Sequence, residues 1–507
     1  MRFHLALWVG KAVAWAISVF FPRRGTNKSG VIACRIAPRF LSCFTGIDPD
    51  KTIFVTGTNG KSTSNNLIVH AFRTAGYRVA TNLEGANLFT GIATALLKNS
   101  SLSGRLRADY LICEVDERSL ARVRSAIPAR FLCVTNIQKD QVQRNGDPDY
   151  IVRKIVGAMD DSMTVFVNNE EPRSSSLSAS AGRTVRFSVA PSGRVAHPDE
   201  YAVTMPCPMC HDALAFSSRN LAGIGEFSCP TCGFASKQDP DYRVEQVDYS
   251  AKLLRINGHD FHLEYDAAHF IYNYALCYAV AAEFGLTTSQ IARGFETFRN
   301  VSGRLEEFTY GGMAIRYLRI KQENPETLQS AIDDISPRDE DPRHPTPPSH
   351  PDPPTCHPDL PLCHPDLPLC HPDEVRISAI TNKDGDGDPA SGRMTGTVFV
   401  LGLQLVHDIV PHYSNTAYFF DCDLSPLFER GVETCICFGS VNCYDAATRL
   451  AYAGFPEDKI IVVDSDDPKD VLEAVAKTGA PRAYLMTMLG EYESLRAFAD
   501  RTGGGRP

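Results

Sequence analysis

A glycine-rich loop between a short apolar strand and a helix constrains the fold of this chain more than any other feature. Residues 52–55 (TIFV) predict a buried strand, TGTNGKST follows at once, and residues 64–76 have the apolar spacing of a helix. A strand, a glycine loop and a helix in this order open a parallel α/β domain. The 507 residues are enough for two or three such domains, and a content of 43% hydrophobic residues rules out a fibrous or wholly disordered chain.

The loop has the chemistry of a phosphate-binding site. Its glycines allow backbone N–H groups to turn inward, and the following helix offers its positive N-terminal end. Lys61 would reach the β- and γ-phosphates of a nucleotide, and the Ser62 hydroxyl would hold Mg²⁺. Val55 stands where the usual motif has its first glycine, so a chance match is the competing interpretation. The candidate nucleotide-binding residues are Gly57, Thr58, Asn59, Gly60, Lys61, Ser62 and Thr63.

A magnesium ion at this loop would need hard oxygen ligands. Glu114 follows LIC within the run at 110–115 (YLICEV), where a carboxylate would lie beside the phosphate loop, and Glu84 in NLEGAN is a second candidate. The neighbouring Asp116 and Glu117 are expected to be solvated. Surface charge is the alternative role for both glutamates.

Two CxxC pairs separated by 18 residues predict a zinc ribbon at 205–233. Four thiolates on two tight turns form a closed tetrahedral site without an open position, so the metal would be structural. Because the flanks are only weakly basic and the chain has a net charge of −9, nucleic acid is not an expected partner. The four ligands would be Cys207, Cys210, Cys229 and Cys232.

The N-terminal region, residues 1–50, is expected to be an apolar helical segment. Residues 5–21 are mostly apolar, but Lys11 interrupts them and they fall short of the roughly 20 residues that a spanning helix needs. A helix packed on the body of the protein is favoured over one lying on a membrane surface.

The second half of the chain predicts a further α/β domain. A long apolar helix is expected at 267–286, and apolar strands are expected at 397–403, 433–438 and 459–464. Residues 337–373 hold a tandem CHPDLPL repeat whose prolines exclude helix and central strand. We predict a disordered insert there, and a duplication tolerated in a loop is favoured over metal binding by its Cys and His.

Several segments together resemble the Mur ligase superfamily and, within it, the MurT group. TGTNGKST resembles the Mur ligase phosphate loop, and a four-cysteine ribbon separates the MurT group from other Mur ligases. Further similar segments are NLEGAN at 82–87, EVDE at 114–117, TNIQKDQVQRNG at 135–146, FIYNYAL at 270–276, Gly303-Arg304 and Asn324-Pro325. The resemblance implies an α/β fold with a Mur ligase-like central P-loop ATPase domain at 51–300, which carries the inserted ribbon. A Rossmann-like C-terminal α/β domain would follow at 301–507, with the insert at about 337–396.

The resemblance also implies an activity. Proteins of this group use ATP and Mg²⁺ to activate the α-carboxylate of D-glutamate in the lipid II stem peptide as an acyl phosphate. Ammonia from a GatD-like glutaminase subunit, the partner in a heterodimer, then displaces phosphate and leaves D-isoglutamine. The expected location is the cytoplasm, with the inner face of the membrane, where lipid II lies, as an alternative. The resemblance gives Lys61 and Glu114 catalytic roles and adds Asn273 and Arg304 to the nucleotide-binding residues.

One departure concerns the residue that would complete the glutaminase triad. Where the group carries an aspartate, this chain has Asn415, and an amide can still orient a histidine. Asp408, Asp421 and Asp423 are the alternatives. A second departure is Lys321, which lies two residues further from Asn324 than the group's pattern requires.

Two other function classes compete with this hypothesis. A Mur or folylpolyglutamate ligase that adds an amino acid would share the phosphate loop but lacks the ribbon. A zinc-ribbon nucleotide-binding module without catalysis would be compatible with Asn415 and the repetitive insert. A neighbouring gene for a small glutaminase would favour the amidotransferase.

Overall fold

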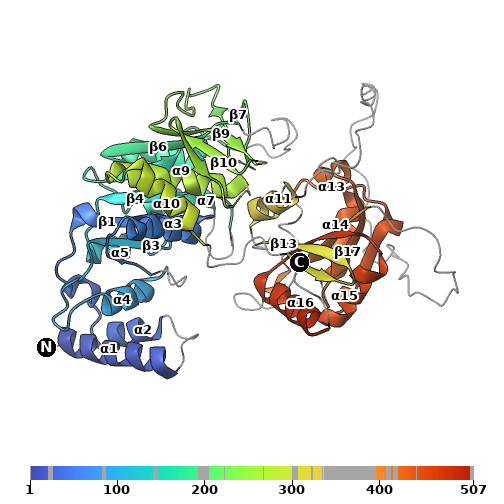
Figure 1. The fold of residues 1–507 in the computed structure, drawn as a ribbon. Coiled ribbons are helices and arrows are strands. Elements are labelled where there is room, and N and C mark those ends of the chain that lie inside the picture. The colour runs from blue at the N-terminus through green and yellow to red at the C-terminus, as the bar shows by residue number, and fades with distance from the viewer. Residues whose placement is uncertain are drawn as a thin grey trace, which may run out of the picture.

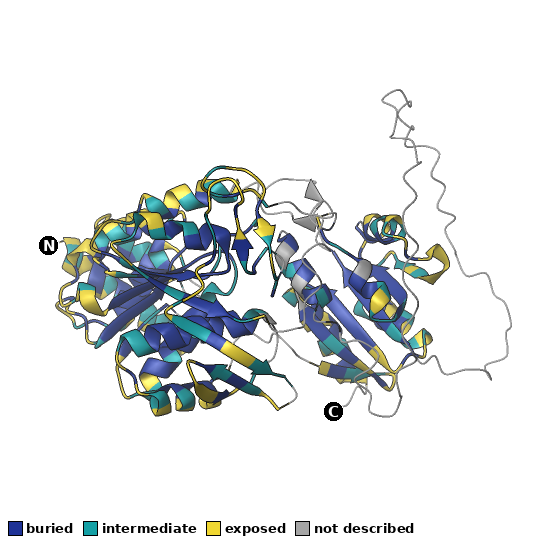
Figure 2. Cartoon of the chain, turned by 90° about the horizontal axis from the view of Figure 1, so that it is seen from above, coloured by how far each residue is buried: buried dark blue, intermediate teal, exposed yellow. Residues whose placement is uncertain are grey.

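The structure is a computed structural model of the whole chain. It describes residues 2–20, 27–82, 87–140, 147–191, 205–249 except 222, 251–265, 268–299, 307–320, 324–335 except 334, and 396–502 except 404, 407–412, 415–418, 420 and 441. Two α/β bodies lie side by side, each with a buried sheet between helices (Figures 1 and 2).

The first body is built on a nine-stranded sheet in which β1 (Thr52–Thr56) lies between β3 (Tyr110–Glu114) and β4 (Phe131–Val134). The sheet order is β11-β10-β9-β6-β5-β4-β1-β3-β2, and all strands from β1 to β6 are parallel. Chain order reverses on the two sides of β1, so the loop after β1 lies at a switch point, where open α/β sheets bind ligands. The remaining strands are β2 (Val79–Ala80), β5 (Thr164–Asn168), β6 (Arg183–Val189), β9 (Tyr242–Asp248), β10 (Leu253–Ile256) and β11 (His259–His262).

Helices cover both faces of this sheet because its strands are apolar on both sides. Ile53, Val55 and Ile112 pack on one face against helices α3 (Lys61–Thr74), α9 (Ala268–Glu283) and α10 (Thr288–Thr297). Phe54 and Leu111 pack on the opposite face. That face is covered by α4 (Phe89–Lys98), α5 (Leu120–Ala126) and α7 (Pro148–Val156). Further short helices are α8 (Pro172–Ser176), η1 (Leu41–Cys43), η2 (Pro49–Lys51) and η3 (Leu177–Ser180).

Two helices form an N-terminal layer beside α4, at the lower end of the first body in Figure 1: α1 (Arg2–Phe20) and α2 (Lys28–Ile36). The inner side of α1 is buried through Ala6, Leu7 and Gly10, and its other side is exposed. The prediction of a packed helix is therefore correct for one side of α1 only. By length and composition α1 is also apolar enough to cross a membrane, and 17% of its most apolar stretch is buried.

The second body contains a six-stranded sheet of order β12-β13-β19-β14-β17-β18, parallel except for β12. The strands expected near 397, 433 and 459 are confirmed as β14, β17 and β18. The strands are β12 (Glu307–Tyr310), β13 (Met313–Arg319), β14 (Thr397–Gly402), β17 (Val432–Phe438), β18 (Ile460–Val463) and β19 (Arg482–Thr487), and a separate pair comprises β15 (Leu405–Val406) and β16 (Tyr413–Ser414). The helices are α11 (Pro325–Asp333), α13 (Ser425–Glu429), α14 (Cys443–Tyr452), α15 (Pro468–Lys477), α16 (Leu489–Thr502) and the short η6 (Glu457–Lys459).

Candidate nucleotide site

The loop after β1 has a backbone that only glycine permits at two positions. Gly57 has φ 123° and Gly60 has φ 77°, both in the left-handed region. A Cβ on Gly57 would lie 2.3 Å from Thr135 Oγ1, and one on Gly60 would lie 2.6 Å from Asn273 Oδ1. The loop is thus pressed against the segment that follows β4 and against α9, so its shape is fixed by its neighbours.

Hydrogen bonds from the segment after β4 hold this shape. The N–H of Thr58 donates to Asn136 O at 2.8 Å, and the N–H of Asn59 donates to Asn136 Oδ1 at 2.9 Å. Thr135 Oγ1 donates to Asn59 O at 2.7 Å, and the N–H of Gln138 donates to Thr58 Oγ1 at 2.9 Å. The sequence of this segment resembles a family motif, but the sequence alone does not assign a role to the side chains of Thr135 and Asn136.

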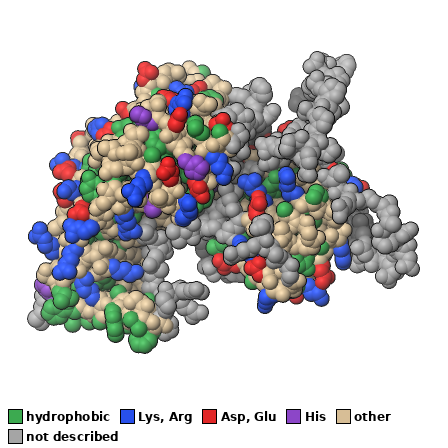
Figure 3. Space-filling view, viewed as in Figure 1, with side chains coloured by type: hydrophobic (Ala, Val, Ile, Leu, Met, Phe, Trp, Pro, Cys, Tyr) green, Lys and Arg blue, Asp and Glu red, His purple; other side chains and the backbone are tan. Residues whose placement is uncertain are grey.

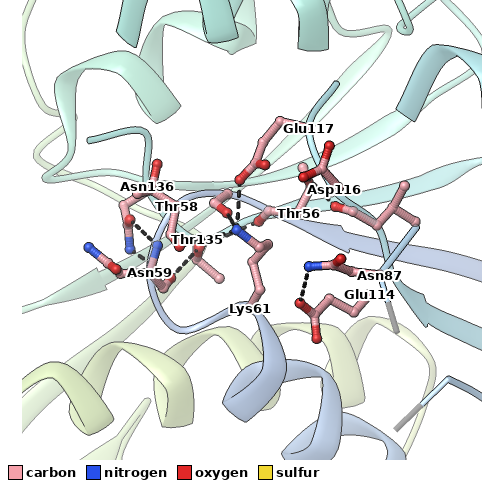
Figure 4. Close-up of polar contacts among 12 residues, drawn as sticks. Thr56, Thr58, Asn59, Lys61, Asn87, Glu114, Asp116, Glu117, Thr135 and Asn136 are labelled. Carbon is pink, nitrogen blue, oxygen red and sulfur yellow. Dashed lines mark hydrogen bonds and ion pairs between the residues drawn. The ribbon is translucent and has the colours of Figure 1, made fainter. Parts of the chain in front are cut away.

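Lys61 is the first residue of α3, and its ammonium group contacts three oxygen atoms. Its Nζ donates to Glu117 Oε1 at 2.8 Å, to Thr58 O at 3.2 Å and to Gly57 O (Figure 4). Burial alone would lower the pKa of Lys61, but the carboxylate of Glu117, helped by Glu114 and Asp140, raises it above the usual value. Lys61 is therefore a permanent cation at the mouth of the loop.

The expected solvation of Asp116 and Glu117 is wrong. Both side chains are buried, because the turn after β3 folds over the phosphate loop. Glu117 is then the ion-pair partner of Lys61. Lys61 and Glu117 are 56 residues apart, so the sequence around Glu117 does not indicate this ion pair.

Glu114 lies where a magnesium ligand was expected. Its Oε2 accepts a hydrogen bond from Ser62 Oγ at 2.7 Å, and its Oε1 accepts one from Asn87 Nδ2 at 3.0 Å. Asn82 exchanges two further hydrogen bonds with the Glu114 backbone, at 2.8 and 3.0 Å. The hydroxyl and carboxylate that would bind Mg²⁺ thus lie together, with one amide bonded to the carboxylate and another to the backbone of the same residue. The other candidate, Glu84, lies outside the described residues.

Asn273 meets the loop from α9. Its Oδ1 accepts a hydrogen bond from Ser64 Oγ at 2.9 Å, while its Nδ2 is buried without a hydrogen-bond partner among the described residues. An unpaired buried donor beside a phosphate loop fits an oxygen-rich ligand. Thr63 is buried in the first turn of α3. Arg304, the last expected nucleotide contact, lies outside the described residues.

Asn324 connects the second body to the phosphate loop. It is fully buried, its Nδ2 donates to Lys139 O at 2.7 Å, and its Oδ1 accepts from Asn59 Nδ2 at 3.2 Å. The same Oδ1 accepts from the N–H of Thr327 at 2.8 Å and so caps α11. Lys139 also forms an ion pair with Asp421, with its Nζ 2.5 Å from Oδ2.

We expect Asn324→Ala to destabilise the C-terminal body by about 1–2 kcal/mol, through the loss of a helix cap and a buried hydrogen bond. Asn324→Asp is the matched control, because a carboxylate still caps α11 but cannot donate to Lys139 O. Thermal unfolding should therefore separate the two variants, whereas both should raise the KM for a nucleotide. Equal melting temperatures for all three proteins would show that the cap is not formed.

The expected glutaminase-facing residues are only partly described. Asn415 and Asp408 lie outside the described residues, as does Lys321. Asp421 is occupied by its ion pair with Lys139. The backbone N–H and C=O of Asp423 are bonded to the Gln329 side chain at 2.7 and 3.1 Å.

The four ribbon cysteines converge. Their sulfur atoms all lie within 4.8 Å of one another, with Cys207 and Cys232 3.7 Å apart and Cys210 and Cys229 3.5 Å apart. Each CxxC turn is closed in the same way: a residue with positive φ follows it, His211 in one and Gly233 in the other. The small strands β7 (Ala215–Phe216) and β8 (Phe227–Ser228) pair beneath the two turns.

Known proteins resemble this chain in both bodies. Residues 55–199 match the family described as the Mur ligase middle domain, and residues 395–492 match the family described as MurT ligase C-terminal. A pseudomurein peptide ligase type C from Methanothermus fervidus superposes with a TM-score of 0.60 at 14% identity, covering 92% of this chain and 81% of its own. The MurF ligase from Thermotoga maritima, solved in complex with ADP, gives 0.54 at 12% identity, covering 94% and 85%.

The fold and the loop after β1 therefore define a protein with the α/β architecture of the Mur ligases. Within that class, the chain is similar to the MurT subunits of lipid II isoglutaminyl synthase, as its motifs predicted. It is 29% identical to the subunit of Staphylococcus aureus strain COL over 56% of this chain and 64% of that protein, less than two thirds of its length. It is also 29% identical to the subunit of Streptococcus pneumoniae R6, over 66% of this chain and 74% of that protein.

Proposed function

We propose that this chain is the ATP-using subunit of an enzyme that amidates the D-glutamate α-carboxylate of lipid II in peptidoglycan synthesis. The observation that carries the proposal is the joint position of Lys61, Ser62 and Glu114 at the switch point of a Mur ligase-like sheet. The names of the MurT relatives supply the substrate class. The chain would work with a GatD-like glutaminase as a heterodimer.

ATP held at this loop would supply the phosphoryl group that activates the carboxylate as an acyl phosphate. Ammonia from the glutaminase would then displace inorganic phosphate and form the amide. The chain's own residues prepare for this. Gly57 and Gly60 let the loop pack against Thr135 and Asn273, where a Cβ would clash, so that the loop's backbone is held in a shape suited to phosphate. Lys61 provides a fixed positive charge, and Glu117 holds it in place. Asn273 offers an amide donor from the opposite side.

Ser62 and Glu114 form the proposed magnesium site. A serine hydroxyl and a carboxylate are hard oxygen ligands. Asn87 orients the carboxylate as an outer-shell partner does at a metal site, and Asn82 holds the Glu114 backbone. The metal would offset charge on the phosphate oxygens beside Lys61.

We expect Glu114→Gln to raise the Mg²⁺ concentration needed for half-maximal ATP hydrolysis by about 10- to 100-fold, because it keeps the shape of the side chain and removes its charge. Glu457→Gln, an exposed acidic position in the second body, is the matched control. A Mg²⁺ titration of both variants measures the difference. An unchanged midpoint for Glu114→Gln would assign the metal to other ligands.

The cysteine cluster is proposed to bind one structural Zn²⁺. Its four sulfur atoms have the number and convergence of a closed tetrahedral site. Backbone N–H groups, Cys232's first among them, lower the pKa of Cys229 to about 7, whereas burial raises the pKa of Cys207, so a bound metal would have to supply the positive charge that favours the remaining thiolates. The ribbon would therefore stabilise the lobe without taking part in the reaction.

Co-expression with a GatD-like glutaminase tests the whole proposal. The complex should convert lipid II, glutamine, water and ATP into amidated lipid II, glutamate, ADP and inorganic phosphate, with amidation detected by a mass decrease of the stem peptide. Free ammonia should replace glutamine when the glutaminase is omitted. Incorporation of an amino acid instead of ammonia would show a Mur-type amino acid ligase, and ATP binding without turnover would show a non-catalytic module.

A further inference from the structure

The exposed side of α1 carries a continuous apolar stripe. Leu5, Trp8, Ala12, Trp15 and Val19 follow each other at alternating steps of three and four residues, and all five are exposed. This spacing places them on one side of a helix, opposite the buried Ala6, Leu7 and Gly10. The large side chains among them are 52–65% exposed, and Phe20, the last residue of α1, is 67% exposed.

The stripe continues onto the neighbouring loop. The indole N–H of Trp8 donates to Leu102 O at 3.0 Å, and the Leu102 side chain is itself 68% exposed. Figure 3 shows hydrophobic side chains gathered at the lower edge of the first body, where α1 lies, with lysine and arginine side chains directly above them. An apolar patch of this kind on a water-facing surface marks an interaction site.

The layer that carries the stripe is strongly basic. The described residues 2–20, 27–47 and 88–108 contain eight lysines and arginines and no aspartate or glutamate, whereas the rest of the chain contains 43 basic and 60 acidic side chains. Seven of these eight basic side chains are exposed, among them Lys98, Arg105 and Arg107. A partner for this surface must therefore be both apolar and negatively charged.

We propose that α1 and the loop at 99–107 dock the protein on an anionic lipid bilayer, with α1 lying in the plane of the interface. Tryptophans favour the membrane–water interface, and basic side chains around them are attracted to anionic headgroups. A second copy of the chain is a poorer fit, because a symmetric contact through this face would bring two basic layers together. A lipid-linked substrate would lie at the same surface, a link that rests on the proposed function.

The inner contacts of α1 favour docking over spanning. Phe3 packs against Phe40 and Phe44 at ring-centroid distances of 5.4 and 5.3 Å, and a Cβ on Gly10 would touch Leu97. Lys11 Nζ donates to Ser100 O at 2.7 Å and to Leu97 O. A spanning α1 would have to break these contacts and expose the apolar surfaces of α2 and α4 to water.

The protein itself carries the probe for this proposal. Trp8 and Trp15 are the only two tryptophans in the chain, so intrinsic fluorescence reports on α1 alone. With vesicles of phosphatidylglycerol and phosphatidylcholine, we expect a blue shift of the emission and quenching by brominated acyl chains. With phosphatidylcholine alone, or at high salt, binding should fall at least tenfold.

Two variants and their controls decide the contribution of each feature. Leu5→Glu/Val19→Glu should weaken vesicle binding at least tenfold while leaving the melting temperature unchanged, whereas Tyr452→Glu, an exposed apolar position on α14, should bind as the unaltered protein does. Arg105→Glu/Arg107→Glu should also weaken binding, whereas Lys459→Glu/Lys477→Glu, with the same change in net charge, should not.

Either of two results would overturn the proposal. One is the absence of a blue shift and of bromolipid quenching with anionic vesicles. The other is a dimer that Leu5→Glu/Val19→Glu converts to a monomer, with no vesicle binding in either form. The vesicles contain neither lipid II nor ATP, so this test can fail or succeed independently of the proposed enzymatic activity.

Discussion

Replacing Lys61 by alanine is expected to reduce ATP hydrolysis and lipid II amidation by roughly 10²–10³-fold, the effect of removing one charge-stabilising donor from a preorganised site. Lys61 is the cation that the loop places beside Glu117 and the Ser62–Glu114 pair. Because its side chain leaves from the first turn of α3 and contributes no apolar core surface, the fold should persist. The melting temperature should fall, because the buried Glu117 loses its ion-pair partner, so turnover is compared at a temperature at which the variant is folded.

Two comparison variants make this test specific. Lys61→Arg keeps the charge, but its planar head cannot contact the same three oxygen atoms in the same way, so it should recover only part of the activity. Lys459→Ala removes an exposed lysine from the second body and should leave ATP hydrolysis unchanged. Full turnover by Lys61→Ala would contradict the assignment of residues 57–63 as the phosphate-binding loop, and therefore also the proposed function.

The phosphate loop and its position could be predicted from sequence because all of its information is local. A β-branched run, two glycines and a lysine lie within ten residues, and the predicted strand and helix are present as β1 and α3. Glu114 could be placed because a parallel strand neighbouring β1 ends at the same edge of the sheet. These are consequences of strand periodicity and sheet geometry.

The contacts that lock the loop could not be predicted because they join distant segments. Asn59 meets Gln138 and Asn324, which lie 79 and 265 residues further along the chain. The segment around Glu117 has the composition of a surface turn. Glu117 is nevertheless buried, because the turn after β3 lies against the phosphate loop and brings Glu117 to Lys61. The exposure of one side of α1 could not be predicted either. An apolar helix can have the same sequence whether other elements cover one of its sides or all of them.

Replacing Cys207 by serine is the second change with a large expected effect, this time on stability. A structural zinc contributes its binding free energy to folding, so removing one thiolate should unfold the lobe at 205–236. The lobe has only a small apolar core of its own, formed mainly by Leu214 and Phe227 beside the cysteines. Without metal, the four sulfur atoms would have little to hold them within 4.8 Å of one another.

The unfolding should be confined to the end of the lobe that carries the cysteines, because the base of the lobe is anchored in the first body. Asn220 Nδ2 donates to Val189 O at 2.9 Å and to Tyr272 Oη at 3.0 Å, and Leu221 and Ile224 lie in the main core. The N–H of Gly225 donates to Glu170 O at 3.0 Å, and the N–H of Lys237 donates to Asn169 Oδ1 at 3.0 Å. The phosphate loop takes no hydrogen bond from the lobe's described residues. Nucleotide affinity should therefore change by less than about threefold, the behaviour expected of a closed structural site and not of a catalytic one.

Zinc content, limited proteolysis and nucleotide binding together measure this prediction. The unaltered chain should hold one Zn²⁺, and Cys207→Ser should lose the metal and become sensitive to protease within 205–236. Cys43→Ser, an exposed cysteine outside the cluster, should do neither. If the serine variant proves insoluble, chelation of zinc from the unaltered protein gives the same readout. A folded, protease-resistant chain without zinc would show that the four cysteines hold the lobe together in another way.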